Sequence, residues 1–449
     1  MCARESLRIG TGAGFSGDRI DPAVVLAERG NIDFLVFECL AERTIALAQL
    51  EKLKDPARGF DPRLEERMEA VLVTCRQRAI RIVTNSGAAN PHAGAGVIAG
   101  IARSRGLRGM KIAAVTGDDV LEHVRENAGD YKREYPELAT IEDRIISANA
   151  YLGAAPIVQA LDRGADIVIT GRVADPALFL APLVHAFRWP MDDWPLMGKG
   201  TLVGHLLECA GQLTGGYFAD PPFCNVPEVA DLGFPIAEVT ADGSATFTKA
   251  PRTGGLLNVA TCTQQLLYEV HDPHQYVTPD AVADFSAVQF SQVGPDRVRA
   301  AGAAGAQRPD RLKVVVAYLD GYIGEGQLSY AGPNALARAQ LALEIVLQRL
   351  KRAGLSDHEL RGELIGVNSV IQTADVTSSP APQELRIRIA GRACNQRDAA
   401  RIGDEVEALY TNGPAGGGGA TKSVREVIAL LPMLIPRDSA SPRITIQET

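Results

Sequence analysis

The sequence predicts an α/β protein, with a doubly wound, mostly parallel sheet in the N-terminal half and an α+β second domain with hairpins. In the first half, short apolar runs alternate with helical patterns, and strands separated by helices imply βαβ units. The runs are apolar on both faces, as strands buried between two helical layers are. After about residue 218, proline-rich segments and hairpin signals replace this alternation.

Residues 1–218 should form the parallel α/β domain, with five strands connected by helices. We expect the helices over segments such as 21–30, 62–79 and 90–106. The expected strands are 6–10, 32–38, 80–85, 110–117 and 165–171.

Residues 219–449 should form the α+β domain, which we expect to close on the first. Asp242-Gly243 is a hairpin turn signal between two strand-like runs. The other expected elements are strands at 312–324 and 384–393, a long helix at 334–354, a short strand at 407–413 and a helix at 423–434.

Composition excludes several classes of protein. The net charge of −8 argues against a nucleic-acid partner, which favours a basic surface. The first residues lack the charged start and apolar run of a secretory signal. Charged residues and a proline interrupt the most apolar stretch, at Arg172, Asp175 and Pro176, which excludes a membrane span there. Seven cysteines without a CxxC pair indicate neither a disulfide framework nor structural zinc. We expect a cytoplasmic protein with reduced thiols.

Polar residues gather after every expected strand of the first half. In an open parallel sheet, ligands bind beyond the carboxyl ends of the strands, so these residues are the first candidates for a site. Arg172 has no capping role and should meet an anionic group, whereas Asp175-Pro176 also reads as a helix start. In chain order the candidates are Asp18, Arg19, Glu38, Glu42, Arg43, Asn85, Ser86, Asp118, Asp119, Arg172 and Asp175.

The loop Gly12–Gly17 fits GxGxxG, and Glu38 ends the next strand about 20 residues on, as a ribose-binding acid would. This pattern keeps NAD(P) binding through Gly14 open as an alternative. Against it, the loop does not run directly into its helix, because residues 18–21 intervene before Pro22.

A second cluster lies in residues 200–218. On a helix His205, Glu208 and Cys209 fall at i, i+3 and i+4 and share one face. Such a face could hold a metal or an activated thiolate beside a base. The alternative is a buried cysteine with a packed histidine.

The run Gly413–Ser423 contains four consecutive glycines between an expected strand and an expected helix. Converging backbone amides at a helix start, with a lysine beside them, bind anions such as phosphate or carboxylate. Ala420 and Thr421 separate the glycines from the lysine, so the run is not a P-loop. The alternative is a permissive turn. The candidate anion ligands are Gly413, Gly416, Gly417, Gly418, Lys422 and Ser423.

Taken together, these segments resemble the acyclic terpene utilisation AtuA family over nearly the whole chain. The matching motifs are "GTGAGFSGDR", "NSGAANP", "VTGDD", "GADIVITGRVADPALFLAP", "HLLECAGQLTGGYF" and "LYTNGPAGGGG". The resemblance implies a role in the catabolism of citronellol- and geraniol-type compounds through branched acyl-CoA intermediates. Longer members carry a small extra C-terminal domain, so the resemblance suggests that this domain is either absent here or supplied by a separate small subunit. We also expect a homo-oligomer.

The leading hypothesis is therefore an enzyme that acts on an acyl-CoA or related carboxylate by lyase or hydratase chemistry. Glu38, Asp118, Asp119 and Glu208 are its candidate carboxylates, and Arg172 would stabilise negative charge. A divalent metal, if present, would favour Asp118 and Asp119. Three alternatives remain: a non-catalytic core subunit that binds ligand and assembles with a small partner or carboxylase, an NAD(P)-dependent oxidoreductase, and an acyl transferase or hydrolase using Cys209 and His205.

Overall fold

The computed structural model describes residues 5–355, 360–371 and 382–449. The chain divides into two compact units: Met1–Ala317 with Leu430–Thr449, and Tyr318–Ala429. This division differs from the predicted boundary at residue 218. The second unit is an insertion in the sequence of the first, since the chain returns to the first unit after Ala429. The expectation that one domain closes on the other stays a prediction.

The first unit is built on the parallel strands that the sequence predicts, and all five are confirmed. They lie in the order β1-β2-β3-β6-β4, and each neighbouring pair is parallel. Their bounds are β1 Ser6–Ala13, β2 Phe34–Phe37, β3 Arg81–Thr84, β4 Lys111–Thr116 and β6 Ile167–Thr170.

Helices cover both faces of this sheet, so the α/β, doubly wound prediction is confirmed. Helices α1 (Asp21–Arg29), α3 (Leu64–Gln77) and α4 (Pro91–Ser104) share one hydrophobic core with side chains such as Leu35, Ile82 and Ile112. Helices α8 (Ala155–Asp162), α9 (Ala177–Phe187) and α10 (Trp194–Leu207) pack against one another. Helices α8 and α9 contact strands of the same sheet, but none of their residues belongs to that core. This second group of helices therefore lies on the opposite face of the sheet.

Antiparallel strands extend the sheet at both edges, and those at one edge lie after the predicted boundary at residue 218. Beyond β1 lie β7 (Pro235–Thr240), β8 (Ala245–Lys249), β12 (Arg297–Ala301) and β11 (Gln289–Gly294). The hairpin at Asp242-Gly243 is confirmed, and because β7 pairs with β1, it joins the first unit. At the other edge β18 (Arg443–Glu448) pairs antiparallel with β4.

The first unit contains further elements that the sequence did not predict. Among them β5 pairs with β14 outside the main sheet, and β13-β10-β9 form a small sheet. No helix within the described ranges is both long enough and apolar enough to cross a bilayer. The remaining bounds are α2 Glu42–Lys54, α5 Leu121–Glu126, α6 Ala128–Glu134, α7 Leu138–Ile141, β5 Ile145–Ala150, α11 Val259–Leu267, β9 Tyr276–Val277, β10 Val282–Asp284 and β13 Ala304–Ala306.

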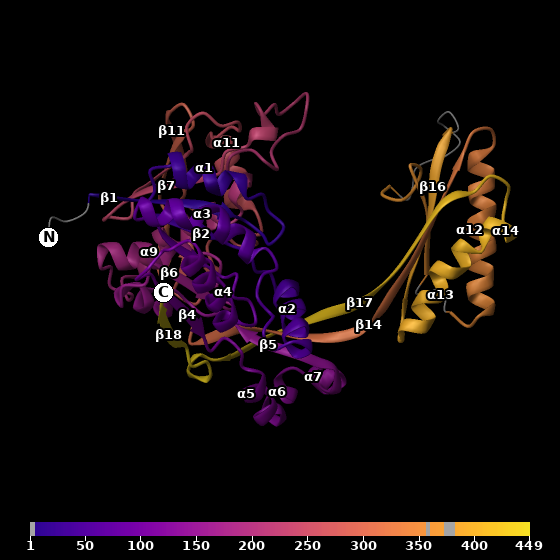
Figure 1. Cartoon of the computed structure of the whole chain (residues 1–449), viewed down its shortest axis with the longest axis horizontal. Coiled ribbons are helices and arrows are strands. Elements are labelled where there is room, and N and C mark those ends of the chain that lie inside the picture. Colours follow the sequence, from indigo (N-terminus) through magenta and orange to yellow (C-terminus); the bar gives the residue numbers. More distant parts are fainter. Residues whose placement is uncertain (1–4, 356–359, 372–381) are drawn as a thin grey trace. The chain divides into compact units, whose positions relative to one another are not determined.

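The second unit is α+β, as predicted, with helices packed on an antiparallel sheet in the order β15-β16-β14-β17. Its core joins the strands to α12, α13 and α14, and Figure 1 shows α12 and α13 beside β16. The predicted strands at 312–324 and 384–393 and the helix at 334–354 are confirmed. The bounds are β14 Arg311–Ala331, α12 Ala335–Arg352, β15 Leu360–Ile365, β16 Glu384–Ala393, α13 Gln396–Glu407, α14 Leu409–Asn412 and β17 Gly418–Pro436.

Two predictions around the glycine run are wrong. The segment 407–413 is mostly α14 rather than a strand, and 423–434 lies in β17 rather than in a helix. The apolar residues of 423–434 fit helical spacing, but Val424, Val427 and Ile428 are β-branched and favour a strand once a partner strand is available. Pro432 is compatible with β17 because this strand lies at the edge of its sheet.

Candidate active site

A cavity of about 640 Å³ opens in the first unit beyond the carboxyl ends of β1, β2 and β6. Its location is the one predicted for ligand binding in an open parallel sheet. Segments after these three strands line it, together with the end of α10 and residues of β14. The acidic and basic side chains of the lining are Glu38, Glu42, Asp175, Glu208, Glu269, Arg311 and Lys313.

Glu38, which follows β2, is a buried carboxyl group in the cavity wall. Its Oε1 accepts hydrogen bonds from the Leu40 amide (2.8 Å) and Asn85 Nδ2 (2.9 Å). Burial, reinforced by the nearby Asp175 carboxylate, raises the pKa of Glu38 to about 8. Glu38 can therefore hold or release a proton near neutral pH, as a general acid or base must.

Asn85 and Ser86 were expected to bind substrate, but both are buried away from the cavity lining. Asn85 Oδ1 accepts from the Cys39 amide at 2.7 Å while its Nδ2 donates to Glu38. The two contacts fix the amide orientation. Ser86 Oγ lies 2.7 Å from Thr84 Oγ1. Asn85 is therefore a positioning residue for Glu38.

Glu208 lies at the end of α10, paired with the imidazole of His205, as the predicted shared face requires. The distance from Glu208 Oε1 to His205 Nδ1 is 3.0 Å, and His205 Nε2 lies 3.1 Å from the Leu266 carbonyl oxygen. A carbonyl only accepts, so Nε2 carries a hydrogen and donates it. The contact between Nδ1 and Oε1 then holds a single proton, which the two residues share.

The environment of this pair favours proton transfer at the cavity. Burial raises the pKa of Glu208 to about 7, and His205 opposes a further rise. Burial alone would lower the pKa of His205, but Glu208 and the Leu266 carbonyl raise it. Glu208 Oε2 is buried without a hydrogen-bond partner in a residue that lines the cavity.

Cys209 was predicted as a candidate nucleophile with His205 as its base, and the geometry argues against that pairing. Both ring nitrogens of His205 contact other groups. Burial, together with the Glu208 charge, raises the pKa of the Cys209 thiol, which disfavours the reactive thiolate. The thiol lines the cavity but lacks an activating base among its described contacts.

Arg172 was predicted to bind an anionic group, but the residue is 1% exposed and its guanidinium contacts protein groups instead. Its Nε donates to the Val173 carbonyl at 2.8 Å, and its other donors contact the Leu40 carbonyl and the Asp175 carboxylate. Asp175 and Pro176 also fit the start of a helix. No side chain caps helix α9, and the Asp175 carboxylate pairs with Arg172 instead.

Asp118 and Asp119 were predicted as catalytic or metal-binding residues. Asp118 Oδ2 accepts from the Arg172 amide (2.9 Å) and Asn149 Nδ2 (3.0 Å), and the residue is absent from the cavity lining. Burial raises the pKa of Asp118 to about 6. Asp119 Oδ1 accepts from the Leu121 amide at 3.1 Å. Across the described ranges, no three potential ligands of the His, Cys, Asp or Glu types gather, so this pair lacks a third such ligand.

Sequence reasoning named Glu42 but missed its two partners in the cavity wall, Tyr151 and Lys313. The Tyr151 hydroxyl donates to Glu42 Oε1 at 2.5 Å, and Lys313 Nζ lies 3.1 Å from the same oxygen. Although burial opposes it, these contacts lower the pKa of Glu42 to about 2. Lys313 comes from β14, which pairs with β5 beside Tyr151. Only this long-range pairing brings Lys313 to the cavity, so no local sequence signal could reveal it.

The first glycine loop belongs to the cavity wall, but its glycine has a packing role. A Cβ on Gly14 would lie 2.6 Å from the backbone carbon of Cys209, so this position needs glycine whatever the ligand. The Asp18 carboxylate accepts hydrogen bonds from the amides of Gly14 (2.9 Å) and Arg19 (2.8 Å) and stabilises the loop conformation. Arg19 pairs with Asp21 at the surface.

The predicted anion site at Gly413–Ser423 loses its geometric basis, because β17 replaces the expected helix. Gly416 and Gly419 have positive φ angles of 77° and 64°, which explains part of the glycine run as a turn into β17. Lys422 Nζ lies 2.8 Å from Asp404 and 2.6 Å from Glu407. These contacts raise the pKa of Lys422. Gly413, Gly417, Gly418 and Ser423 belong to the same stretch of the second unit.

Glu38→Gln should raise the melting temperature at pH 8 and leave it nearly unchanged at pH 5. Folding raises the Glu38 pKa from 4.5 to about 8, so the folded chain binds this proton more tightly than the unfolded chain between those pH values. The stability that Glu38 contributes is present below pH 4.5 and is lost as the pH rises towards 8. Glutamine carries no charge at either pH and keeps an oxygen for Leu40 and Asn85. Differential scanning fluorimetry at both pH values measures this, with the exposed Glu69→Gln as control. Equal changes at both pH values would contradict the assignment.

The model of the acyclic terpene utilisation family protein AtuA matches residues 7–446. No curated protein and no solved structure shows significant similarity to the chain.

Proposed function

Because the chain belongs to the acyclic terpene utilisation AtuA family, we propose that it is an enzyme that acts on a branched acyclic carboxylate or its CoA thioester by acid–base chemistry of the lyase or hydratase type. The observation that carries the proposal is the presence of two buried carboxyl groups, Glu38 and Glu208, in the wall of one cavity with pKa values of about 8 and about 7. Raised pKa values of this kind are characteristic of general acids and bases.

The proposed chemistry needs one group to remove a proton beside a carbonyl and another to protonate the neighbouring carbon or leaving group. Glu38 and Glu208 supply the two proton-transfer groups. The proton that Glu208 shares with His205 lets the Glu208 carboxyl be either protonated or ionised. Lys313, half exposed beside Glu42, offers a positive charge to a carboxylate or phosphate at the same cavity. Apolar residues of the lining, including Val277, Pro279, Leu312 and Leu434, are suited to a hydrocarbon chain.

A thermal-shift panel tests the ligand class. A ligand present at about 100 times its Kd stabilises the folded state by about 2.7 kcal/mol. We expect branched acyl-CoA thioesters or carboxylates to raise the melting temperature, and NAD(P) to leave it unchanged. Lys313→Met should reduce the shift, whereas Lys422→Ala should leave it intact because its ammonium is held by Asp404 and Glu407.

Mass spectrometry of the ligands recovered after incubation then separates an enzyme from a subunit that only binds. Conversion of the stabilising ligand supports the proposal. Stabilisation without conversion would favour the non-catalytic subunit, and a shift with NAD(P) alone would favour an oxidoreductase.

A further inference from the structure

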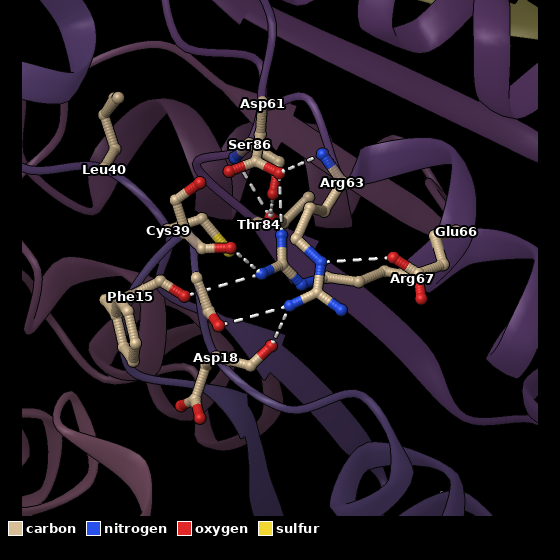
Figure 2. A network of polar contacts seen from close by, with 12 residues as sticks. Phe15, Asp18, Cys39, Leu40, Asp61, Arg63, Glu66, Arg67, Thr84 and Ser86 are labelled. Atoms are coloured by element: carbon tan, nitrogen blue, oxygen red, sulfur yellow. Dashed lines mark hydrogen bonds and ion pairs between the residues drawn. The ribbon is translucent and has the colours of Figure 1, made fainter. Parts of the chain in front are cut away.

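The loop Gly14–Asp18 separates the cavity from two arginines of the α3 segment, Arg63 and Arg67. Gly14, Phe15 and Ser16 line the cavity, and neither arginine does. Arg67 is fully buried and paired with the buried Asp61, with 2.7 Å between Nη1 and Oδ1. Figure 2 shows both arginines reaching the backbone of this loop from the same side. The two arginines, which do not line the cavity, therefore bind the loop on its other side.

The arginines bind the loop through four consecutive carbonyl groups. Arg67 Nη2 contacts the carbonyl oxygens of Phe15 (3.5 Å) and Ser16. Arg63 Nη1 donates to those of Gly17 (3.2 Å) and Asp18 (2.6 Å). All four oxygens thus face the guanidinium groups (Figure 2).

In a planar trans peptide, the N–H points opposite to the C=O of the same unit. The peptide unit that contains the Phe15 carbonyl also contains the Ser16 N–H. The unit that contains the Ser16 carbonyl also contains the Gly17 N–H. Those two amides must therefore point away from the arginines. Ser16 lines the cavity, and Gly17 follows it in the loop. None of the hydrogen bonds found within the described ranges uses either amide as a donor. The loop thus offers two adjacent donors, one of them from a residue of the cavity lining.

The same loop lies beside the proton-transfer pair. Gly14 packs so closely on the Cys209 backbone that an added Cβ would lie 2.6 Å from its carbonyl carbon, and Glu208 precedes Cys209 in the chain. Ser16 and Glu208 line the same cavity, so a molecule bound there can contact both.

We propose that the amides of Ser16 and Gly17 form an oxyanion subsite, oriented by Arg63 and Arg67, which binds the carboxylate or thioester carbonyl oxygen of the substrate. The inference rests on the proposed function and deepens it by naming the head group of the substrate. Two backbone donors fixed in this way stabilise negative charge that develops on a carbonyl oxygen when a proton leaves the neighbouring carbon. Arg63 and Arg67 are positioning residues, because they act through the loop.

Isothermal titration calorimetry with citronellate and citronellol, which share one carbon skeleton and differ in the head group, tests the subsite. The wild-type chain should bind the carboxylate more tightly. Arg63→Ala should weaken citronellate binding roughly tenfold or more, since hydrogen bonds to a charged group are involved, and leave citronellol within about twofold. Glu66→Gln is the matched control, because it removes the surface partner of Arg63 without touching the loop, and Arg63→Lys should retain part of the preference.

Hydrogen exchange of the wild-type chain provides a measurement that depends on no variant. Citronellate should slow exchange in the peptide that contains Ser16 and Gly17, and citronellol should not. Equal loss of affinity for both compounds in Arg63→Ala, or equal protection by both in exchange, would overturn the subsite while leaving the proposed function standing. Failure of the wild-type chain to bind either compound, together with no thermal shift from branched acyl-CoA thioesters, would overturn both proposals.

Discussion

Replacing Arg67 with methionine should lower the free energy of unfolding by about 3–5 kcal/mol, because it leaves a buried carboxylate without its counter-charge. Arg67 is 0% and Asp61 2% exposed, so water cannot solvate the charge that remains. Urea denaturation followed by circular dichroism at pH 7 measures the loss.

Two further variants identify the cause of this loss. Arg76→Met removes an arginine from the same helix whose ion pair with Asp166 is largely exposed, so it should cost at most about 1 kcal/mol. Asp61→Asn with Arg67→Met removes both charges but keeps an oxygen for the Arg63 amide, which Asp61 Oδ1 contacts at 2.8 Å. The double variant should recover much of the stability. If it were as unstable as Arg67→Met, lost packing rather than an unpaired charge would be responsible.

Glu208→Gln should reduce kcat by about 10²–10⁴-fold, the usual range for removal of a general acid or base. Ligand affinity should change little, because glutamine keeps the shape of the side chain. The assay follows consumption of the ligand selected by the thermal-shift panel. The wild-type pH–rate profile should contain an ionisation near 7, in line with the Glu208 pKa, and this ionisation should disappear in the variant.

His205 acts through Glu208, so its replacement should move this ionisation rather than remove it. Because the imidazole lowers the Glu208 pKa, His205→Asn should shift the ionisation to higher pH. Glu69→Gln, an exposed position on α3, is the control for the loss of one acidic side chain. A pH profile unchanged in both Glu208→Gln and His205→Asn would exclude the pair from proton transfer.

The parallel core could be predicted because its signals are local. Each strand of the first half is a short apolar run bounded by polar residues, and the same pattern places Glu38 beyond β2. His205 and Glu208 were found because helical spacing alone brings them together. What failed depended on distant partners: β17 forms where β14 provides a neighbouring strand, although its own residues also fit helical spacing.

The roles of the charged residues were harder to predict than their positions. Arg172 follows β6 as expected, but sequence cannot reveal that the Leu40 and Val173 carbonyls occupy its donors. Lys313 reaches the cavity only through the pairing of β14 with β5. Arg63 and Arg67 read as ordinary residues of a charged helix, and only the folded structure brings them to the carbonyls of a loop some fifty residues earlier.

The insertion of the second unit has a consequence for the order in which the protein folds during synthesis. The strand β18 completes the edge of the main sheet beside β4, yet every residue of the second unit is translated before it. The second unit can therefore leave the ribosome whole while β4 still lacks its outer neighbour. Until residues 443–448 emerge, that edge presents unpaired backbone groups of the kind that chaperones shield and that drive aggregation.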